Sequence, residues 1–264
     1  MHQAASFPQL GTAPGLLRAK RIAVLGSARG LGLAVAQAAE AAGAEVHGID
    51  TVRRFEGLAA FYQADLSDGS ALGAVAAALP EGLDGLIACP DIDALAPRDT
   101  LLLGLLAPRV LAEALAPRMA RGASVVLRGA PVMPHRPENL PEIRAAMALR
   151  HADAGAFVAR WGLHLDPART ARTVGWALIA WVMAHCWRYA DRDIRMNAVS
   201  PASASGHLPP EIVAARGHDA AMGAGQAAQA ALFLLSDLSR GMTGANLAVD
   251  GGLSAQALCR ADGI

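Results

Sequence analysis

The stretch Arg21–Gly32, RIAVLGSARGLG, constrains the fold more than any other part of the chain. Its apolar start is typical of a buried strand, and Gly26, Gly30 and Gly32 follow where the chain must turn and begin a helix. Glycine at these places permits a sharp exit from the strand, close approach of backbone amides to a pyrophosphate, and tight packing of the helix on the strand. The sequence therefore predicts a strand, turn and helix whose N-terminus can hold a phosphate.

Asp50 gives this glycine turn its context. A helix is expected over Leu31–Ala42 and a strand over Glu45–Ile49, and Asp50 stands at the end of that strand. A carboxylate about 20 residues beyond the glycines is where a dinucleotide-binding fold places its ribose acceptor. The alternative role for Asp50 is that of a turn residue at the end of a strand.

Composition excludes several classes of protein. The chain has 264 residues, 53% of them hydrophobic, which is enough for one sizeable core, and 23 basic residues balance 23 acidic ones. Without net charge or a basic tract, neither nucleic acid nor an anionic membrane surface is an expected partner. Cys89, Cys186 and Cys259 are widely spaced and form no Cys-x-x-Cys pair, so we expect buried, inert thiols with neither a disulfide framework nor a metal site.

We expect an N-terminal extension over residues 1–19, followed by one α/β domain over residues 20–264. Residues 1–19 lack the basic start and apolar run of a secretory signal, which predicts a cytoplasmic protein. The most apolar stretch, Thr173–Trp187, is shorter than the roughly 20 residues of a membrane span, so a buried helix is expected there and no membrane partner.

Short apolar runs alternate with helical patterns along the rest of the chain. Further strands are expected over Phe61–Ala64, Gly85–Cys89, Ser124–Leu127, Arg195–Ser200 and Asn246–Val249. Further helices are expected over Asp68–Leu79, Thr100–Met119, Pro167–Ala190 and Gly225–Leu235. Pro108 and Pro117 should bend or split the second of these helices. Residues 130–166 are expected to form an inserted segment with a helix around Glu142–Ala159. This alternation predicts a single Rossmann-type, doubly wound parallel sheet of about seven strands with helices on both faces.

Four stretches resemble the short-chain dehydrogenase/reductase family over nearly the whole chain. They are the GSARGLG turn, Asp65–Leu66 after the third expected strand, IRMNAVSPA over Ile194–Ala202 and TGANLAVDGG over Thr243–Gly252. The GID that ends at Asp50, the DGLIAC before Pro90 and the long insertion are similar to the branch that contains 3α-hydroxysteroid dehydrogenase/carbonyl reductase. The resemblance implies hydride transfer between NAD(P) and a carbonyl or alcohol substrate.

The resemblance also implies a cofactor site built from the glycine turn and the ends of the next two strands. The matching residues are Gly26, Ser27, Arg29, Gly30, Leu31, Gly32, Asp50, Asp65 and Leu66. Asp50 favours NAD(H) over NADP(H), because a carboxylate accepts hydrogen bonds from ribose hydroxyls and repels a 2′-phosphate, whereas Arg29 and Arg53 act in the opposite direction. Asp91 stands where the family has a glycine, and its carboxylate is expected to weaken or abolish the binding of an anionic cofactor.

The family's acid/base pattern, Tyr-x-x-x-Lys, is absent. In the family the tyrosine is the general acid or base and the lysine lowers its pKa, because a phenol with a pKa of about 10 is a poor base at neutral pH. Tyr62 and Tyr189 are the only tyrosines of this chain, and Lys20 is its only lysine. None of them stands at the family's positions.

The four catalytic positions of the family carry small residues here. Counting back from Ile194 places the tyrosine at Ala171 and the lysine at Gly175. The serine that orients the carbonyl falls at Gly129, and the asparagine that holds a proton-relay water falls at Gly104. No catalytic residue is therefore assigned.

One hypothesis is a pseudoenzyme: a non-catalytic subunit that pairs with an active homologous NAD-dependent dehydrogenase, or that binds NAD(H) without turnover. The missing acid/base group ordinarily supplies about 10² to 10⁴ in rate. The family pairs subunits through the helices over 100–119 and 167–190, so a homologous subunit in a hetero-oligomer, or a second copy in a homo-oligomer, is expected to dock there.

Two other hypotheses remain open. An active NAD(H)-dependent oxidoreductase of a carbonyl or alcohol would need substitute groups, and the candidates near the emptied pocket are His164, Asp166, His151 and Arg128. Each of them also has an ordinary structural explanation, as Asp166 before Pro167 is a typical helix N-cap. A non-redox enzyme or ligand sensor would use the vacated space, provided that Trp176 or Met147 does not fill it.

Overall fold

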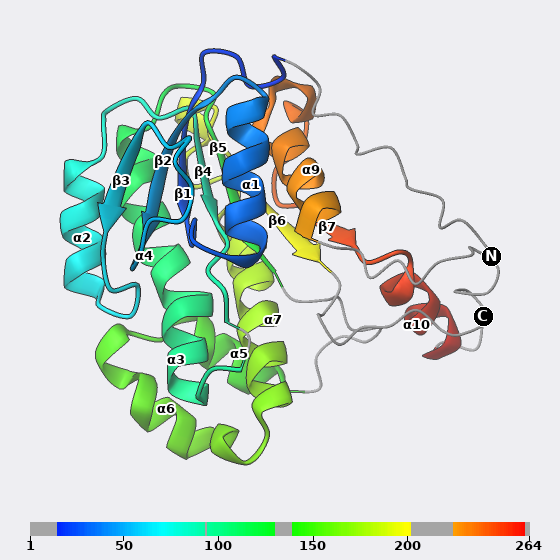
Figure 1. The fold of residues 1–264 in the computed structure, drawn as a ribbon. Coiled ribbons are helices and arrows are strands. Elements are labelled where there is room, and N and C mark those ends of the chain that lie inside the picture. Colours follow the sequence, from blue (N-terminus) through cyan, green and yellow to red (C-terminus); the bar gives the residue numbers. More distant parts are fainter. Residues whose placement is uncertain (1–14, 93, 130–138, 202–223, 262–264) are drawn as a thin grey trace, which may run out of the picture.

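The computed structural model describes residues 15–92, 94–129, 139–201 and 224–261 (Figure 1). Most of the predicted N-terminal extension and part of the predicted insertion, residues 130–138, lie outside these ranges.

A seven-stranded parallel sheet forms the centre of the domain (Figure 1). Its strands are β1 (Arg21–Leu25), β2 (Glu45–Asp50), β3 (Ala60–Gln63), β4 (Gly85–Ala88), β5 (Ser124–Arg128), β6 (Arg195–Pro201) and β7 (Asn246–Val249). Their order is β3-β2-β1-β4-β5-β6-β7, and every neighbouring pair is parallel. The winding reverses between β1 and β4, where a doubly wound sheet binds its ligand at the carboxyl ends of the strands. The predicted fold class is confirmed.

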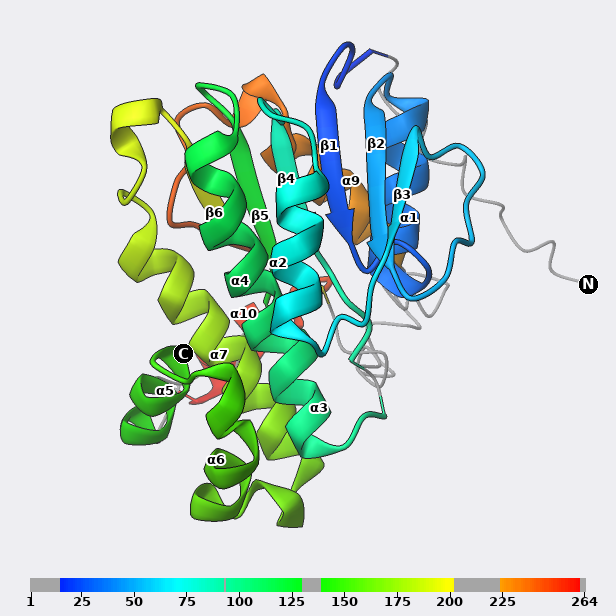
Figure 2. The same ribbon diagram turned by 90° about the vertical axis from the view of Figure 1, so that its left-hand side faces the viewer.

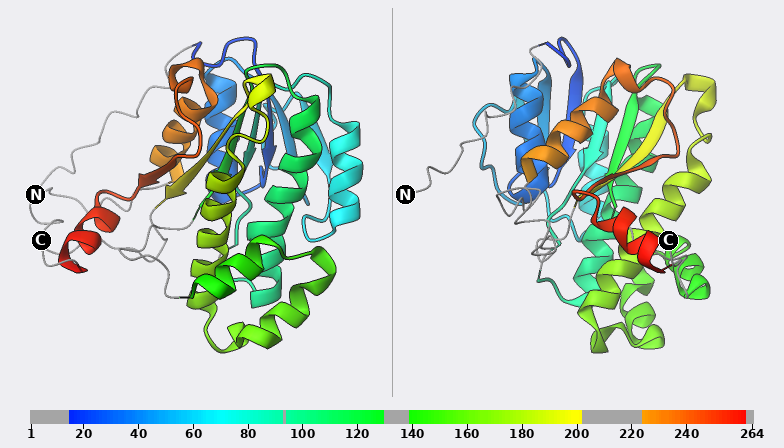
Figure 3. Two further views of the ribbon diagram at one scale, coloured as in Figure 1. Left: turned by 180° about the vertical axis from the view of Figure 1, so that it is seen from behind. Right: turned by 90° about the vertical axis from the view of Figure 1, so that its right-hand side faces the viewer.

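Helices cover both faces of the sheet. α1 (Gly30–Ala41) and α9 (Ala224–Leu235) lie side by side on one face, whereas α2 (Gly69–Ala78), α4 (Ala107–Leu115) and α7 (Pro167–His185) cover the other, which Figure 3, left, shows from outside. Because successive strand residues point to opposite faces, Val126 of β5 packs under α1 and α9 while its neighbours Val125 and Leu127 pack under the second layer. The sheet therefore separates two buried hydrophobic cores, one on each face. The chain ends in α10 (Leu253–Ala261) after β7.

The helix predicted over Thr100–Met119 is split, as its prolines indicated. It consists of α3 (Pro97–Leu101), a π-helical turn η1 (Leu102–Leu106), α4 and a 3₁₀ turn η2 (Ala116–Arg118). Pro108 has no amide to donate to the carbonyl of Gly104, and the wider turn ends just before it. The whole stretch Pro97–Arg118 is long and apolar enough to cross a membrane, but its most apolar part is 67% buried within the fold, as in the core helix of a globular domain.

The inserted segment holds two helices where one was predicted. These are α5 (Leu140–Met147) and α6 (Ala154–Trp161), separated by the 3₁₀ turn η3 (His151–Asp153), so the single helix over Glu142–Ala159 was wrong. Arg109 of α4 donates to the carbonyls of Ala146 and Leu149, at 3.4 and 3.3 Å, and thereby satisfies the end of α5 from outside. The insertion lies beyond the carboxyl ends of the strands, beside α3 and α7 (Figures 1 and 2).

α7 ends at His185 and not at Ala190. Nδ1 of His185 lies 2.8 Å from the carbonyl oxygen of Trp181, and beyond it the amide of Arg188 bonds the carbonyl of His185 at 2.9 Å in a tighter turn. Tyr189 therefore lies outside the helix. The apolar stretch is mostly buried, but its end is not: Met183 and Trp187 are 52% and 79% exposed.

Candidate functional site

Backbone atoms leave no room for a side chain at two positions of the glycine turn between β1 and α1, namely Gly26 and Gly32. Gly26 has φ +87°, and a Cβ on it would lie 2.5 Å from Cα of Pro90. A Cβ on Gly32 would lie 2.1 Å from the carbonyl oxygen of Gly26, which is too close for any side chain. Gly30, the first residue of α1, also has a positive φ of +54°. The geometry thus shows why Gly26 and Gly32 are needed, whereas the approach of a pyrophosphate at Gly30 stays a prediction.

The N-terminus of α1 has no side-chain cap. Its N-cap residue, Arg29, makes no capping hydrogen bond, and no acidic residue stands in the first turn of the helix. Such a terminus presents backbone amides with partial positive charge. It suits a phosphate that approaches over Gly30.

Asp50 ties the glycine turn to β2. Its carboxylate is buried, Oδ2 accepts from the amide of Ala28 at 2.8 Å, and Oδ1 accepts from the amide of Thr51 at 2.7 Å. Oδ1 also accepts from the hydroxyl of Thr51 at 3.3 Å, whereas Oδ2 has a further acceptor position, so the turn-organising role is compatible with a hydrogen bond from a ribose.

The other predicted cofactor residues lie at the same edge of the sheet. Asp65 accepts from the hydroxyl and the amide of Ser67 at 2.7 and 2.8 Å, and these hydrogen bonds lower the pKa of its carboxyl. Leu66 beside it is buried. Ser27 is 1% exposed, and its hydroxyl has no hydrogen-bond partner among the described residues.

The end of β4 lies against the glycine turn. Arg128, at the end of β5, donates to the carbonyl of Pro90 at 3.2 Å and so links β5 to this segment. Cys89 is fully buried, and burial raises the pKa of its thiol to about 12, as expected of an inert cysteine. In the part of the chain that the structure describes, no group of three His, Cys, Asp or Glu side chains gathers as a metal ion would require.

The four predicted catalytic positions all lie on α7 or against it. Ala171 is exposed on α7 and Gly175, one turn later, is buried. A Cβ on Gly104 would lie 2.7 Å from Cγ1 of Val174, so η1 rests on α7 between those two positions. Gly129 meets α7 one turn further on, at Ile179.

Neighbouring side chains fill the space beside the two glycines. Ile92 and Val174 fill it at Gly104. At Gly129, a Cβ would lie 2.4 Å from Oγ of Ser200 and 3.0 Å from Cγ1 of Ile179. These residues, and not Trp176 or Met147, are the nearest atoms at these positions. No sequence pattern indicates them, because they are brought together by the register of β5 and β6 and by the packing of η1 on α7.

The chain's own tyrosines and lysine lie elsewhere. Tyr62 is on β3, Tyr189 follows α7, and burial raises the pKa of both phenols, which is opposite to what a general base needs. Nζ of Lys20 donates to Asp237 at 3.1 Å.

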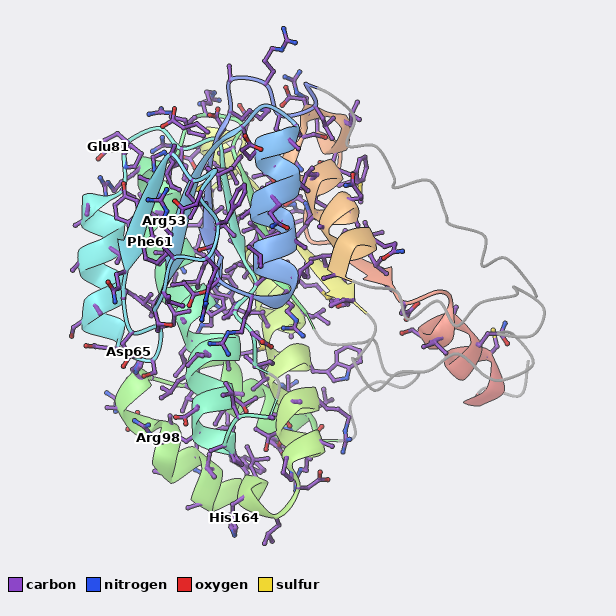
Figure 4. The ribbon with its side chains drawn as sticks, in the orientation of Figure 1. Arg53, Phe61, Asp65, Glu81, Arg98 and His164 are labelled. Atoms are coloured by element: carbon purple, nitrogen blue, oxygen red, sulfur yellow. The ribbon has the colours of Figure 1, made fainter. Side chains whose placement is uncertain are left out.

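The substitute candidates of the insertion have structural surroundings. Asp166 caps α7 by accepting from the amide of Arg169 at 2.9 Å, as predicted. His164 is exposed at the far end of the insertion, away from the sheet (Figure 4). His151 lies in η3, between the two helices of the insertion, and its ring approaches Gly69 at the start of α2.

Known proteins match this chain along most of its length. A family model described as enoyl-(acyl carrier protein) reductase matches residues 172–254. Coniferyl-alcohol dehydrogenase of Pseudomonas sp. (strain HR199 / DSM 7063) is 27% identical over 256 residues, which cover 89% of this chain and 96% of that protein.

Solved structures match as well. The 3-alpha-hydroxysteroid dehydrogenase from Pseudomonas sp. B-0831, complexed with NADH, is 26% identical with a TM-score of 0.72, covering 90% of this chain and 98% of that one. Aldohexose dehydrogenase of Thermoplasma acidophilum, at 20% identity and a TM-score of 0.65 over 92% of this chain and 97% of that one, shares the fold. The sheet order, the glycine turn and these likenesses all support the predicted resemblance to the short-chain dehydrogenase/reductase family.

Proposed function

We propose that the chain is an NAD(H)-dependent oxidoreductase of an alcohol or carbonyl compound, with the dinucleotide across the carboxyl ends of β1, β2 and β4. The observation that carries this proposal is the glycine turn, in which Gly26 and Gly32 are closed by backbone, Gly30 leads into an uncapped helix, and Asp50 is held beside them. The names of the matching proteins, two dehydrogenases of hydroxy compounds, one of them with NADH, support the same class.

The residues present fit the dinucleotide. The amides at the start of α1 would hold the pyrophosphate, and Asp50 would accept from the ribose. When bound, NAD(H) supplies or accepts the hydride. The chain's residues would orient the dinucleotide, and the backbone at the ends of β4 and β5 would lie beside its nicotinamide ring.

Proton transfer would differ from that of the family. Ala171 and Gly175 remove the tyrosine–lysine route, so the proton of the substrate hydroxyl must pass to water or to a side chain outside the family positions. Turnover would then be about 10² to 10⁴ slower than with a positioned base. With hydroxide as the acceptor, the rate of alcohol oxidation would rise with pH without a plateau.

The test is turnover with NAD and a panel of apolar secondary and benzylic alcohols, followed by the near-ultraviolet absorbance of NADH from pH 7 to about 10. NADH formation that depends on the chain and rises continuously with pH supports the proposal. A plateau would indicate a side-chain base, while tight NADH binding without turnover of any alcohol would contradict it.

The second candidate is the non-catalytic subunit, favoured by the filled spaces at Gly104 and Gly129. Such a chain would bind NAD(H) or an active homologous subunit without turnover. α5 packs on the first half of α7 through buried Glu142, which accepts from Thr173 and Arg169. The exposed Met183 near the end of α7 and the exposed Trp187 beyond it would be available to a partner. The side chains packed at Gly104 and Gly129 speak against the ligand-sensor hypothesis, which needs an open pocket.

A further inference from the structure

A carboxylate from another loop lies at the N-terminus of α1. The Cγ and Cβ atoms of Asp91 lie 3.8 and 4.0 Å from the position that a Cβ on Gly30 would take. Gly30 begins α1, a helix of 12 residues whose own first turn contains no acidic residue. Asp91 thus brings a negative charge to a helix end that has none of its own.

The backbone that leads to Asp91 is fixed on the glycine turn. The amide of Cys89 donates to the carbonyl of Leu25 at 3.0 Å, and Cα of Pro90 lies 2.5 Å from where a Cβ on Gly26 would be. Arg128 holds the carbonyl of Pro90 from the β5 side at 3.2 Å. The ring of Pro90 restricts its φ angle, so the direction in which the chain leaves β4 is set before Asp91.

Two anions cannot share this place without cost. A carboxylate near a helix N-terminus stabilises the helix, because it faces the partial positive charge of the free amides. The pyrophosphate of a dinucleotide would use the same amides and would meet the charge of Asp91 at close range.

We propose that Asp91 sets the affinity of the nucleotide site: its carboxylate stands in for the phosphate in the ligand-free protein, stabilises α1 and weakens the binding of NAD(H). This inference rests on the proposed function, because it concerns the same nucleotide site. It predicts two effects of opposite sign from one substitution.

The test compares Asp91→Asn with wild type, because asparagine keeps the shape of the side chain and removes its charge. Glu81→Gln is the matched control: it removes one carboxylate before β4, at the end of the sheet opposite to the candidate site (Figure 4). The measurements are the Kd of NADH by calorimetry at low and high salt, and the melting temperature without nucleotide.

We expect Asp91→Asn to bind NADH about fivefold to tenfold more tightly than wild type at low salt, with a smaller difference at high salt. Its melting temperature without NADH should fall below that of wild type, whereas Glu81→Gln should leave the Kd unchanged. Asp91→Gly, which restores the family residue, should also tighten binding.

Unchanged or weaker binding of NADH by both Asp91 variants, with wild type binding normally, would overturn the inference and leave the proposed function intact. If wild type and both variants all fail to bind NADH while remaining folded, the nucleotide site itself fails, and the proposed function falls with it.

Discussion

Glycine has two different roles in the two halves of the candidate site. The nucleotide half is the glycine turn with Asp50, and the catalytic half is the set of predicted catalytic positions, Gly104, Gly129, Ala171 and Gly175. In the nucleotide half, a Cβ on Gly26 or Gly32 would strike backbone atoms, which cannot move without rebuilding the turn. In the catalytic half, a Cβ on Gly104 or Gly129 would strike side chains, namely those of Val174 and Ser200. Gly26 and Gly32 are therefore required by the backbone conformation. Gly104 and Gly129 are required only by neighbouring side chains, which a further substitution can change.

A physical reason accounts for the difference between the two halves. Phosphate binding by backbone amides needs no particular side chain, so the glycine turn persists as a geometric unit. Acid/base chemistry of the kind that the resemblance implies needs a hydroxyl and an ammonium at fixed places, and where neither is present the space can be used for packing. Ile92 and Ile179 are the apolar side chains that lie there now.

The largest expected effect is that of Gly32→Ala. The added Cβ would lie 2.1 Å from the carbonyl oxygen of Gly26, so the start of α1 must shift away from β1. We expect a loss of about 3 kcal/mol in the free energy of unfolding, measured by urea denaturation, together with loss of NADH binding. A change within about 0.5 kcal/mol would show that the turn yields easily, and the contrast between the two halves would disappear.

A smaller effect is expected from Gly129→Ser, whose Cβ would lie 2.4 Å from Oγ of Ser200. Alone it should cost about 1 to 3 kcal/mol, because Ile179 also crowds the position. Ser200→Ala removes the nearest atom, together with the hydrogen bond of 2.7 Å that Ser200 donates to Asn246. In the double variant the two costs should be less than additive, by about 1 kcal/mol or more in a double-mutant cycle. Additive costs would mean that the two residues do not compete for this space.

The smallest effect is expected at Lys20, the only lysine of the chain, which lies outside both halves of the candidate site. The hydrogen bond from Lys20 is the main cause of the lowered pKa of Asp237. A carboxyl whose pKa is lower in the folded state stabilises the fold above its unfolded pKa of about 3.9, and this contribution is lost as the pH falls through the folded value.

Lys20→Met should therefore cost about 0.5 kcal/mol at neutral pH, since Asp237 is 53% exposed and the pair is screened by solvent. The difference from wild type should shrink when urea unfolding is repeated near pH 3. A difference that persists there would assign the effect to packing of the lysine stem.

Sequence patterns predicted the sheet well and the helices of the insertion poorly, for physical reasons. β1 and β7 are short apolar runs next to glycine turns, and such local signals determine where they begin and end. α5 ends where Arg109 of α4 satisfies its carbonyls, which is a contact between distant parts of the chain.

The candidate site likewise has a part that the sequence predicted and a part that it did not. The glycines and Asp50 were found from spacing, because they lie on one strand–helix–strand unit. The occupants of the catalytic half were not, because Ser200 meets Gly129 only through the pairing of β5 with β6, and Val174 meets Gly104 only through the packing of η1 on α7.

The most direct test of the account is a calorimetric titration of the intact chain with NADH and then with NADPH. If the nucleotide half works without the family's catalytic residues, NADH binds with a Kd of about 1 mM or tighter, and more tightly than NADPH, because Asp50 accepts from a ribose and repels a phosphate. Binding of neither nucleotide, or a preference for NADPH, would contradict the account.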